Sequence, residues 1–305
     1  MRKPRGIRSG DRVAVVAPAS PFDRDVFDRG IVELQDLGYE PVFDDRVFER
    51  DRYLAGSVTQ RAESLVAAWA DPAVAGIFAA RGGYGSAQLL PLLKSAAIGL
   101  SEKPFVGCSD LTALLVFLTS NHQTVGFHGP MLVNLADGEH GYDRQSLVGS
   151  VSLREPLGEL APDGVQVLRS GEAHGLLLGG TLTQLLASLS TPFAFSPPDG
   201  YVLLLDDVGE HPYRVDRMLT QLVQSGLLRR ASGLVCAEFP GCDDPAGYDA
   251  RDVIARALVG FEGPVLFGFP TGHTAGPVWT LPLGVAVTVQ TDPTPRLVVE
   301  EGSVR

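Results

Sequence analysis

Short apolar runs alternate with amphipathic segments through the first half of the chain. The run at residues 13–17 is continuously apolar and stops at Pro18, which is typical of a strand buried on both faces. Residues 22–37 then carry apolar side chains at helical spacing and end at Gly38. Repeated units of a strand and a helix indicate a parallel sheet with helices on both faces. The same alternation predicts further strands at 41–43, 74–79 and 104–107 and helices at 60–69, 86–93 and 111–118.

The pattern weakens after residue 136. Residues 141–170 are rich in Gly, Asp, Glu, Ser and Pro and are predicted to form a linker or crossover. We therefore expect an α/β protein in which a first domain (1–140), built on the parallel sheet, precedes a smaller strand-rich domain (171–305). In the second domain, short apolar runs between Gly and Pro turns predict strands at 201–205, 233–236, 265–267, 285–289 and 297–299, with helices at 213–224 and 250–258.

Composition and charge favour an ordinary globular protein over a nucleic-acid-binding, membrane-spanning or disulfide-rich one. The 305 residues are 45% hydrophobic and 20% charged, as in ordinary globular proteins. The formal net charge of −11 argues against nucleic-acid binding, because an acidic surface repels phosphates. No apolar run reaches the roughly 18 residues of a membrane helix, and no apolar stretch of a signal peptide follows the basic N-terminus. Three cysteines are too few for a disulfide scaffold, so we expect a cytoplasmic protein with no membrane partner.

The sharpest local signal lies where a predicted strand meets the next helix. Gly107 is followed by Cys108, Ser109 and Asp110, an order typical of a nucleophile elbow. In such an elbow the serine is exposed at the sheet edge, and the amide after it faces a developing oxyanion. Leu111 stands where the G-x-S-x-G motif has its second glycine, so the alternative is that Ser109 and Asp110 only cap the helix. Cys108 is predicted to point into the core rather than to act as the nucleophile.

A glycine-rich loop at residues 81–85 also joins a predicted strand to a helix. Its glycines let the backbone approach a ligand closely, so the loop binds an anion, supplies a second oxyanion donor, or is a structural turn. Gln88 fills the third glycine position of a dinucleotide-binding fingerprint, and the chain has no Gly-Lys-Ser/Thr of a P-loop. We therefore expect no nucleotide cofactor.

A serine nucleophile needs a base and a carboxylate that orients the base. Among six histidines, His273 stands out because it lies in a Gly- and Pro-rich loop after an apolar strand. His128 is the second candidate for the base, and the alternative is that it lines the pocket. Asp206 and Asp207 directly follow another apolar strand, which is a common place for a functional carboxylate. The alternative is that they form a turn or cap the next helix.

Together these segments resemble one family, the L,D-carboxypeptidases of serine peptidase family S66, over residues 6–289. Each motif alone is weak, but their order and spacing are specific. The resemblance implies a Rossmann-like N-terminal domain, a strand-rich C-terminal domain, a homodimer, and a site between the domains that needs no metal or cofactor. The matching motifs occupy residues 10–20, 81–85, 107–110, 128–131, 179–182, 205–210, 213–217, 272–273 and 281–284.

The resemblance also implies roles for individual residues. The family uses a Ser-His-Glu triad, and the corresponding residues here are Ser109 as nucleophile, His273 as base and Asp206 as the acid. The family's oxyanion hole is formed by two backbone amides, which here belong to Gly83 and Asp110. The residues that we expect to bind substrate are Arg81, Tyr84, His128 and Thr181.

The sequence departs from the family at three positions. Asp206 replaces Glu and ends roughly 1.5 Å nearer its backbone. Either the backbone compensates, or Asp207 or Glu210 takes over the role, or activity is weak. Thr181 replaces the usual Asn and Thr274 the usual Gly, both in predicted pocket loops.

We therefore predict a serine hydrolase that releases the terminal D-Ala from cytoplasmic murein tetrapeptide during peptidoglycan recycling, through an acyl-enzyme. Its substrate is a small peptide. One alternative is the self-immunity branch of the same family, which cleaves an acyl-linked nucleotide antibiotic, with Trp279 as a candidate for stacking on a base. A second alternative is a ligand-binding module that lost turnover through Asp206.

Overall fold

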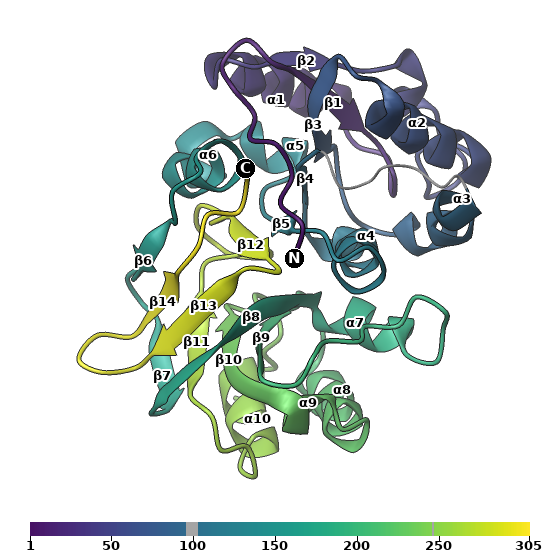
Figure 1. The fold of residues 1–305 in the computed structure, drawn as a ribbon. Helices are drawn as coiled ribbons and strands as arrows, with labels where there is room; N and C mark the ends of the chain where they lie inside the picture. The colour runs from purple at the N-terminus through teal and green to yellow at the C-terminus, as the bar shows by residue number, and fades with distance from the viewer. Residues whose placement is uncertain (96–102, 246) are drawn as a thin grey trace.

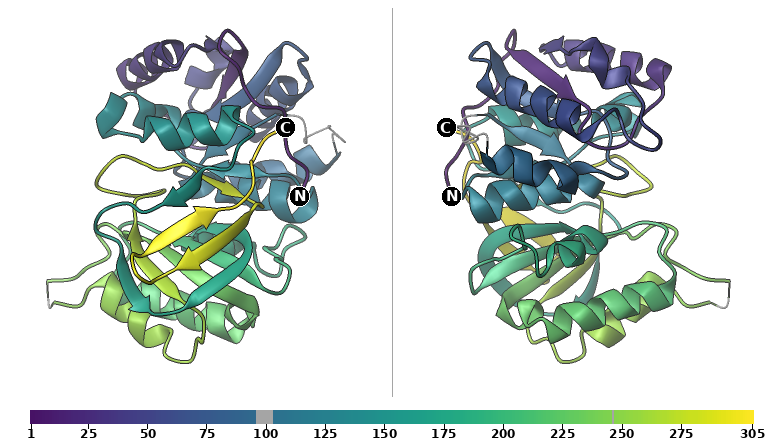
Figure 2. Two further views of the ribbon diagram at one scale, coloured as in Figure 1. Left: turned by 60° about the vertical axis from the view of Figure 1, so that its left-hand side comes forward. Right: turned by 90° about the vertical axis from the view of Figure 1, so that its right-hand side faces the viewer.

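The computed structural model describes residues 1–95, 103–245 and 247–305. Two β-sheets lie one above the other, each accompanied by helices (Figure 1). Both chain ends lie near the junction of the two halves (Figure 2), where the amide of Arg305 donates to the carbonyl oxygen of Pro4 over 2.9 Å. The α/β class predicted from the sequence is confirmed.

The first sheet has six strands in the order β12-β5-β4-β3-β1-β2, and all of its neighbours are parallel except the pair of β12 with β5. Helices flank it on both sides (Figure 1). The strands are β1 (Arg12–Val16), β2 (Glu40–Val42), β3 (Val74–Ala79), β4 (Phe105–Gly107), β5 (Gly126–His128) and β12 (Leu281–Leu283). The helices are α1 (Arg24–Asp36), α2 (Val58–Ala70), α3 (Leu90–Ser95), α4 (Thr112–Val116), α5 (Leu132–Leu135) and α6 (Arg144–Ser152).

The second sheet has eight strands in the order β6-β14-β13-β8-β9-β10-β11-β7. Its centre, from β8 to β11, is parallel, and antiparallel strands extend both sides. The strands are β6 (Gly158–Leu160), β7 (Gln166–Arg169), β8 (Glu172–Thr181), β9 (Tyr201–Asp206), β10 (Ala231–Ala237), β11 (Val265–Phe269), β13 (Ala286–Gln290) and β14 (Arg296–Val299). The helices of this half are α7 (Leu182–Ser188), α8 (Pro212–Gln224), α9 (Leu227–Arg230) and α10 (Ala250–Ala257).

Burial explains why β9 lies at the centre of the second sheet. Every one of its residues is buried, which matches the continuously apolar run followed by Asp206. Helix α8 covers this sheet with an apolar stripe that includes Val215, Leu219 and Leu222, and Pro212 occupies its first turn, where a missing amide hydrogen costs nothing. The carboxyl ends of the parallel strands therefore carry Asp206 and the loop after β11 toward the first sheet.

The chain from 141 to 170, which we expected to be a linker or crossover, contains regular structure. It includes α6, and its two short strands β6 and β7 form the two edges of the second sheet. Edge strands are short and partly exposed, so their composition resembles that of a loop. Strand β12 lies beyond residue 171 but pairs with β5, so the C-terminal segment returns to complete the first sheet.

Among the described residues, no helix is both long enough and apolar enough to cross a membrane.

Candidate active site

Ser109 sits at a strained turn between β4 and α4. Its φ is +61°, a backbone conformation that non-glycine residues rarely adopt and that is common at functional sites. Cys108 before it is extended, with φ −145°, and a short 3₁₀ turn over Ser109–Leu111 leads into the helix. The Ser109 hydroxyl lies 3.0 Å from His273 Nε2 instead of capping the helix. This geometry is that of a nucleophile elbow, which was the first of the two interpretations of the sequence.

This elbow lacks the second glycine of the G-x-S-x-G motif, and two other glycines, Gly82 and Gly107, make room for it. A Cβ on Gly82 would lie 2.8 Å from the Cβ of Ser109, so only glycine lets the neighbouring loop come so close. A Cβ on Gly107 would lie 3.2 Å from Leu111 Cγ. The Leu111 side chain therefore packs over Gly107, which accommodates a large residue where the motif has a small one.

His273 lies in the loop between β11 and β12 and bridges Ser109 to Asp206. Its Nδ1 is 2.9 Å from Asp206 Oδ2, and its backbone amide donates to Asp206 Oδ1 over 2.9 Å. A carboxylate only accepts hydrogen bonds, so Nδ1 carries the proton and Nε2 presents its lone pair to Ser109. The three residues that the sequence singled out thus form one hydrogen-bonded chain across the two sheets.

Asp206 reaches the imidazole although its side chain is shorter than that of the family's Glu. It is fully buried at the end of β9 and lies beside Thr181, its partner across the parallel pair β8–β9. The Thr181 hydroxyl donates to Asp206 Oδ2 over 3.0 Å. Gly272, at φ +67°, brings the histidine loop close, because a Cβ there would lie 2.6 Å from Asp206 Oδ2. The backbone therefore compensates for the missing methylene.

The two other acids considered for this role have different partners. Asp207 Oδ2 accepts hydrogen bonds from the amide and the hydroxyl of Thr183, at 2.9 and 2.7 Å, and so fastens the start of α7. Glu210 lies 3.3 Å from Arg214 in an ion pair along one helical turn. Asp206 is thus the carboxylate that contacts the imidazole of His273.

Burial and charge act on the pKa of His273 in opposite directions. Burial lowers it, but the hydrogen bond and the charge of Asp206, with a further contribution from the charge of Asp207, raise the pKa above its ordinary value. Burial also raises the pKa of the Cys108 thiol, and the charge of Asp206 adds to that rise. Cys108 is 1% exposed, so it remains a neutral core residue as predicted.

The glycine-rich loop is clamped against the elbow by buried polar groups. The amide of Ser86 donates to Asp110 Oδ2 over 2.8 Å, and its hydroxyl donates to the Asp110 carbonyl oxygen over 2.6 Å. The buried Arg61 donates to the carbonyl oxygen of Gly85 at 2.9 Å. At the other end of the loop, Ser20 Oγ accepts the amide of Tyr84 over 3.1 Å. Sequence reasoning missed Arg61, Ser20 and Ser86 in these roles, although Ser20 ends one recognised motif and Ser86 directly follows another.

Of the residues expected to bind substrate, Arg81 and Tyr84 are exposed. One guanidinium nitrogen of Arg81 donates to the carbonyl oxygen of Pro21 over 2.6 Å. Tyr84 is 51% exposed and packs edge-on against Tyr53, which is 58% exposed, with ring centroids 5.7 Å apart. Both side chains flank Gly82 and Gly83, the loop that touches Ser109.

His128 and Thr181, also expected to bind substrate, are instead buried behind Asp206. His128 is fully buried, and the hydroxyl of Thr271 donates to the Trp279 carbonyl oxygen, so His128 Nδ1 donates to that hydroxyl over 3.1 Å. Its Nε2 lies 3.9 Å from Asp206 Oδ2. Burial lowers the pKa of His128 to about 4, so it is neutral and forms no ion pair. Thr181 is 5% exposed and is engaged by Asp206.

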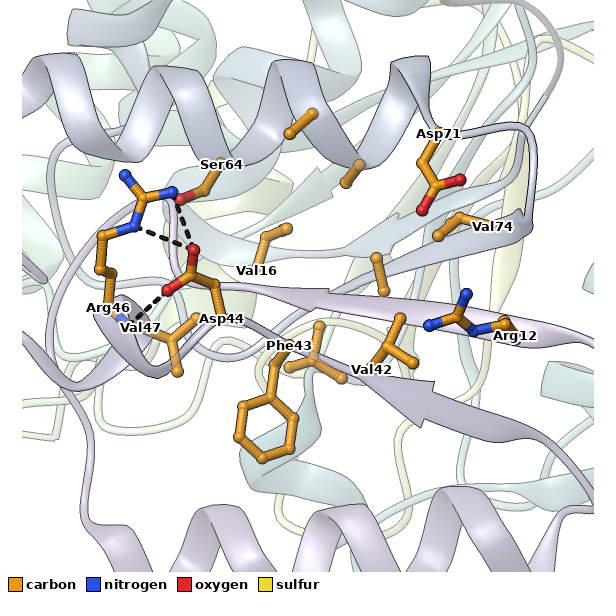
Figure 3. A pocket seen from close by; sticks show the side chains of 14 residues that line it. Arg12, Val16, Val42, Phe43, Asp44, Arg46, Val47, Ser64, Asp71 and Val74 are labelled. Atoms are coloured by element: carbon orange, nitrogen blue, oxygen red, sulfur yellow. Dashed lines mark hydrogen bonds and ion pairs between the residues drawn. The ribbon is translucent and has the colours of Figure 1, made fainter.

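A cavity of about 450 Å³ lies elsewhere, between α2 and the strands β1 and β2 (Figure 3). Its floor is apolar, with Val16 and Val42, and its rim carries Asp44 and Arg46, which bond to each other. None of the residues predicted for the site lines it. Among the described residues, no cluster of three or more His, Cys, Asp or Glu is arranged to hold a metal ion.

Comparison with known proteins identifies the family. The model of the LD-carboxypeptidase N-terminal domain matches residues 13–129, and that of the LD-carboxypeptidase C-terminal domain matches residues 174–289. A putative carboxypeptidase of Streptomyces coelicolor is 36% identical over 295 residues, which cover 95% of this chain and 94% of the relative. The murein tetrapeptide carboxypeptidase of Pseudomonas aeruginosa is 32% identical over 274 residues, covering 87% and 88%.

Solved structures agree on the fold. The microcin C7 self-immunity protein MccF, in its wild-type apo state, superimposes with a TM-score of 0.88 over 99% of each chain, at 22% identity. The fold thus persists where sequence identity is low. The chain belongs to the LD-carboxypeptidase family, peptidase family S66, and is a carboxypeptidase-like hydrolase.

Proposed function

We propose that this chain is a serine-type L,D-carboxypeptidase that releases the terminal D-Ala from murein tetrapeptide in the cytoplasm. The observation that carries the proposal is the hydrogen-bonded chain from Ser109 through His273 to Asp206, with links of 3.0 and 2.9 Å. The identity to the murein tetrapeptide carboxypeptidase of Pseudomonas aeruginosa supports the choice of substrate. From the family resemblance we also propose a homodimer.

The reaction starts when Ser109 Oγ attacks the carbonyl carbon of the peptide bond before the terminal D-Ala. The hydroxyl proton moves to His273 Nε2, and Asp206 stabilises the resulting imidazolium. The carbon–nitrogen bond then breaks, His273 returns its proton to the departing amine, and D-Ala leaves. Water, deprotonated by His273, attacks the remaining ester, and Ser109 regains its proton.

The oxyanion formed in each half of the reaction needs two donors close to Ser109. We propose the backbone amides of Gly83 and Asp110. Asp110 is the second residue of the turn after β4, where backbone amides lack intrahelical partners. Gly83, at φ +97°, lies in the loop that packs on Ser109 and is held there by the contacts of Ser86 with Asp110. Both amides therefore belong to segments fixed relative to the nucleophile.

Substrate contacts are proposed for the exposed side chains of this loop. Arg81 supplies a positive charge for the terminal carboxylate of the peptide, and Tyr84 supplies a planar surface. Trp279, the candidate for stacking on a nucleobase, packs edge-on against Phe269 with ring centroids 6.2 Å apart.

The test is the release of free D-Ala from L-Ala-D-Glu-meso-diaminopimelate-D-Ala. The unmodified chain should release D-Ala, Ser109→Ala should release none, and the adjacent Cys108→Ala variant should retain activity as a matched control. A peptide that ends in L-Ala should remain intact. Tight binding of the tetrapeptide without release would support a binding module, and hydrolysis of an acyl-linked nucleotide alone would support the self-immunity branch.

A further inference from the structure

Two threonines join the nucleophile half of the site to the half that carries the acid and the histidine. The backbone amide of Thr181 donates to Thr112 Oγ1 over 3.0 Å, and the Thr181 hydroxyl donates to Asp206 Oδ2 over 3.0 Å. Thr112 begins α4, three residues after Ser109. The hydrogen bonds from Ser109 to His273 and on to Asp206 therefore continue through both threonines and return to the elbow, which closes a ring across the two sheets.

The contact between the two threonines is buried and tight. Thr112 is 0% exposed, and Thr181 is 5% exposed. Gly180, at φ +140°, brings the end of β8 against α4, because a Cβ there would lie 2.7 Å from Thr112 Oγ1. A buried donor that loses its acceptor is destabilising, so this hydrogen bond resists a change in the spacing between the two halves.

We propose that Thr112 and Thr181 are positioning residues: Thr112 sets the distance of the acid-bearing strands from the elbow, and Thr181 holds the Asp206 carboxylate in the orientation that faces His273. The inference rests on the proposed function of the triad. Neither side chain touches the reacting atoms. Thr181 lies behind Asp206, and Thr112 lies beneath the elbow.

Thr181 also competes with the imidazole for the charge of Asp206. Oδ2 accepts from both His273 Nδ1 and the Thr181 hydroxyl, while Oδ1 accepts from the His273 amide. Removal of the Thr181 donor leaves more of the carboxylate charge to the imidazolium, so the pKa of His273 should rise. The other titratable groups near this pair are His128, Asp207 and Cys108. The Thr181 variants leave all three of these side chains in place.

The first experiment follows the titration of His273 by imidazole ¹H–¹⁵N NMR in the Ser109→Ala background, which requires no turnover. Thr181→Val should raise the pKa of His273 by about half a pH unit, and Thr181→Ser, which keeps the hydroxyl, should restore it. Thr183→Val is the matched control. It removes the hydroxyl of the threonine two residues further along, in α7, and that hydroxyl bonds Asp207 and not Asp206. It should shift the pKa of His273 less than Thr181→Val does, because Asp207 acts on His273 through its charge and not through a hydrogen bond.

The second experiment measures D-Ala release with Ser109 intact. Thr112→Val should lower kcat by about tenfold with KM little changed, and Thr112→Ser should recover it. Circular dichroism on each variant verifies that it is folded. Wild-type kcat in folded Thr112→Val, an unmoved His273 titration in Thr181→Val, or an equal shift in Thr183→Val would overturn the inference. Absence of D-Ala release by the unsubstituted chain would instead count against the proposed function, and the NMR experiment separates the two.

Discussion

Lengthening Asp206 to Glu, the acid that the family usually carries, should damage this site. The substitution adds one methylene, about 1.5 Å of reach, to a side chain that is fully buried. Asp206 Oδ2 is already 2.9 Å from His273 Nδ1 and 3.0 Å from the Thr181 hydroxyl oxygen. A Cβ on Gly272 would lie 2.6 Å from the same oxygen, so the loop in front leaves no space for a longer carboxylate.

The expected size of the effect follows from this crowding. Overpacking a buried position typically costs about 1–3 kcal/mol of folding free energy. Displacing the imidazole from the serine by about 1 Å typically costs about 100-fold in rate. Asp206→Glu should therefore lower kcat for D-Ala release by about two orders of magnitude and reduce the free energy of unfolding measured in urea.

Two variants separate the causes. Asp206→Asn keeps the volume and removes the charge, so it should lower kcat by about 10⁴-fold with little loss of stability. Asp207→Glu adds the same methylene to the neighbouring buried acid, which bonds Thr183 and not His273, and should lower stability while kcat stays near the wild-type value. A kcat for Asp206→Glu equal to or above that of the wild type would refute the claim that the loop is fitted to the shorter acid.

Four further predictions concern the same site. The acid limb of kcat/KM should titrate above the usual histidine pKa of about 6.5, because Asp206 outweighs burial at His273; a limb at or below that value contradicts the geometry. Since this folded-state pKa is raised, the stabilisation from protonated His273 should be complete below about pH 6.5 and disappear as pH rises through the folded-state pKa in urea denaturation. Gly272→Ala should lower kcat at least about tenfold, since alanine is strained at φ +67° and its Cβ would clash with Asp206. Unchanged turnover would show that the loop can move to accommodate the added Cβ. Iodoacetamide should leave D-Ala release intact, because Cys108 is buried and its pKa is raised; inactivation that maps to Cys108 would reopen its role as nucleophile.

The sequence placed candidate residues at the ends of strands. It left open whether Ser109 forms an elbow or a helix cap, and whether Asp206 or Asp207 is the acid, and the family resemblance chose between these alternatives. Ser109 and Asp206 both follow continuous apolar runs, and parallel strands bring such positions to one edge of a sheet. His273 was recognisable because glycines and prolines surround it in a loop after β11. Each of these signals is local and weak alone, and the order and spacing of the motifs made them specific.

Features that depend on contacts between distant segments were missed. His128 and Thr181 were expected to face substrate, but the pairing of β8 with β9 and of β5 with β12 buries both beside Asp206. Strand β8 itself was not predicted, because its glycines weaken a strand pattern. One of them, Gly179, is required by a close approach, since a Cβ there would lie 2.1 Å from the Leu204 carbonyl oxygen. A local sequence pattern specifies neither the register of paired strands nor the close approach of two backbones.

Labelling with a fluorophosphonate tests the central claim most directly, because this reagent reacts with a serine hydroxyl that an adjacent base has activated. We predict a single adduct on Ser109, identified by peptide mass spectrometry, with D-Ala release lost in proportion to labelling and with labelling abolished in His273→Ala. Turnover that persists after Ser109 is fully modified, or equally fast modification in His273→Ala, would contradict the account.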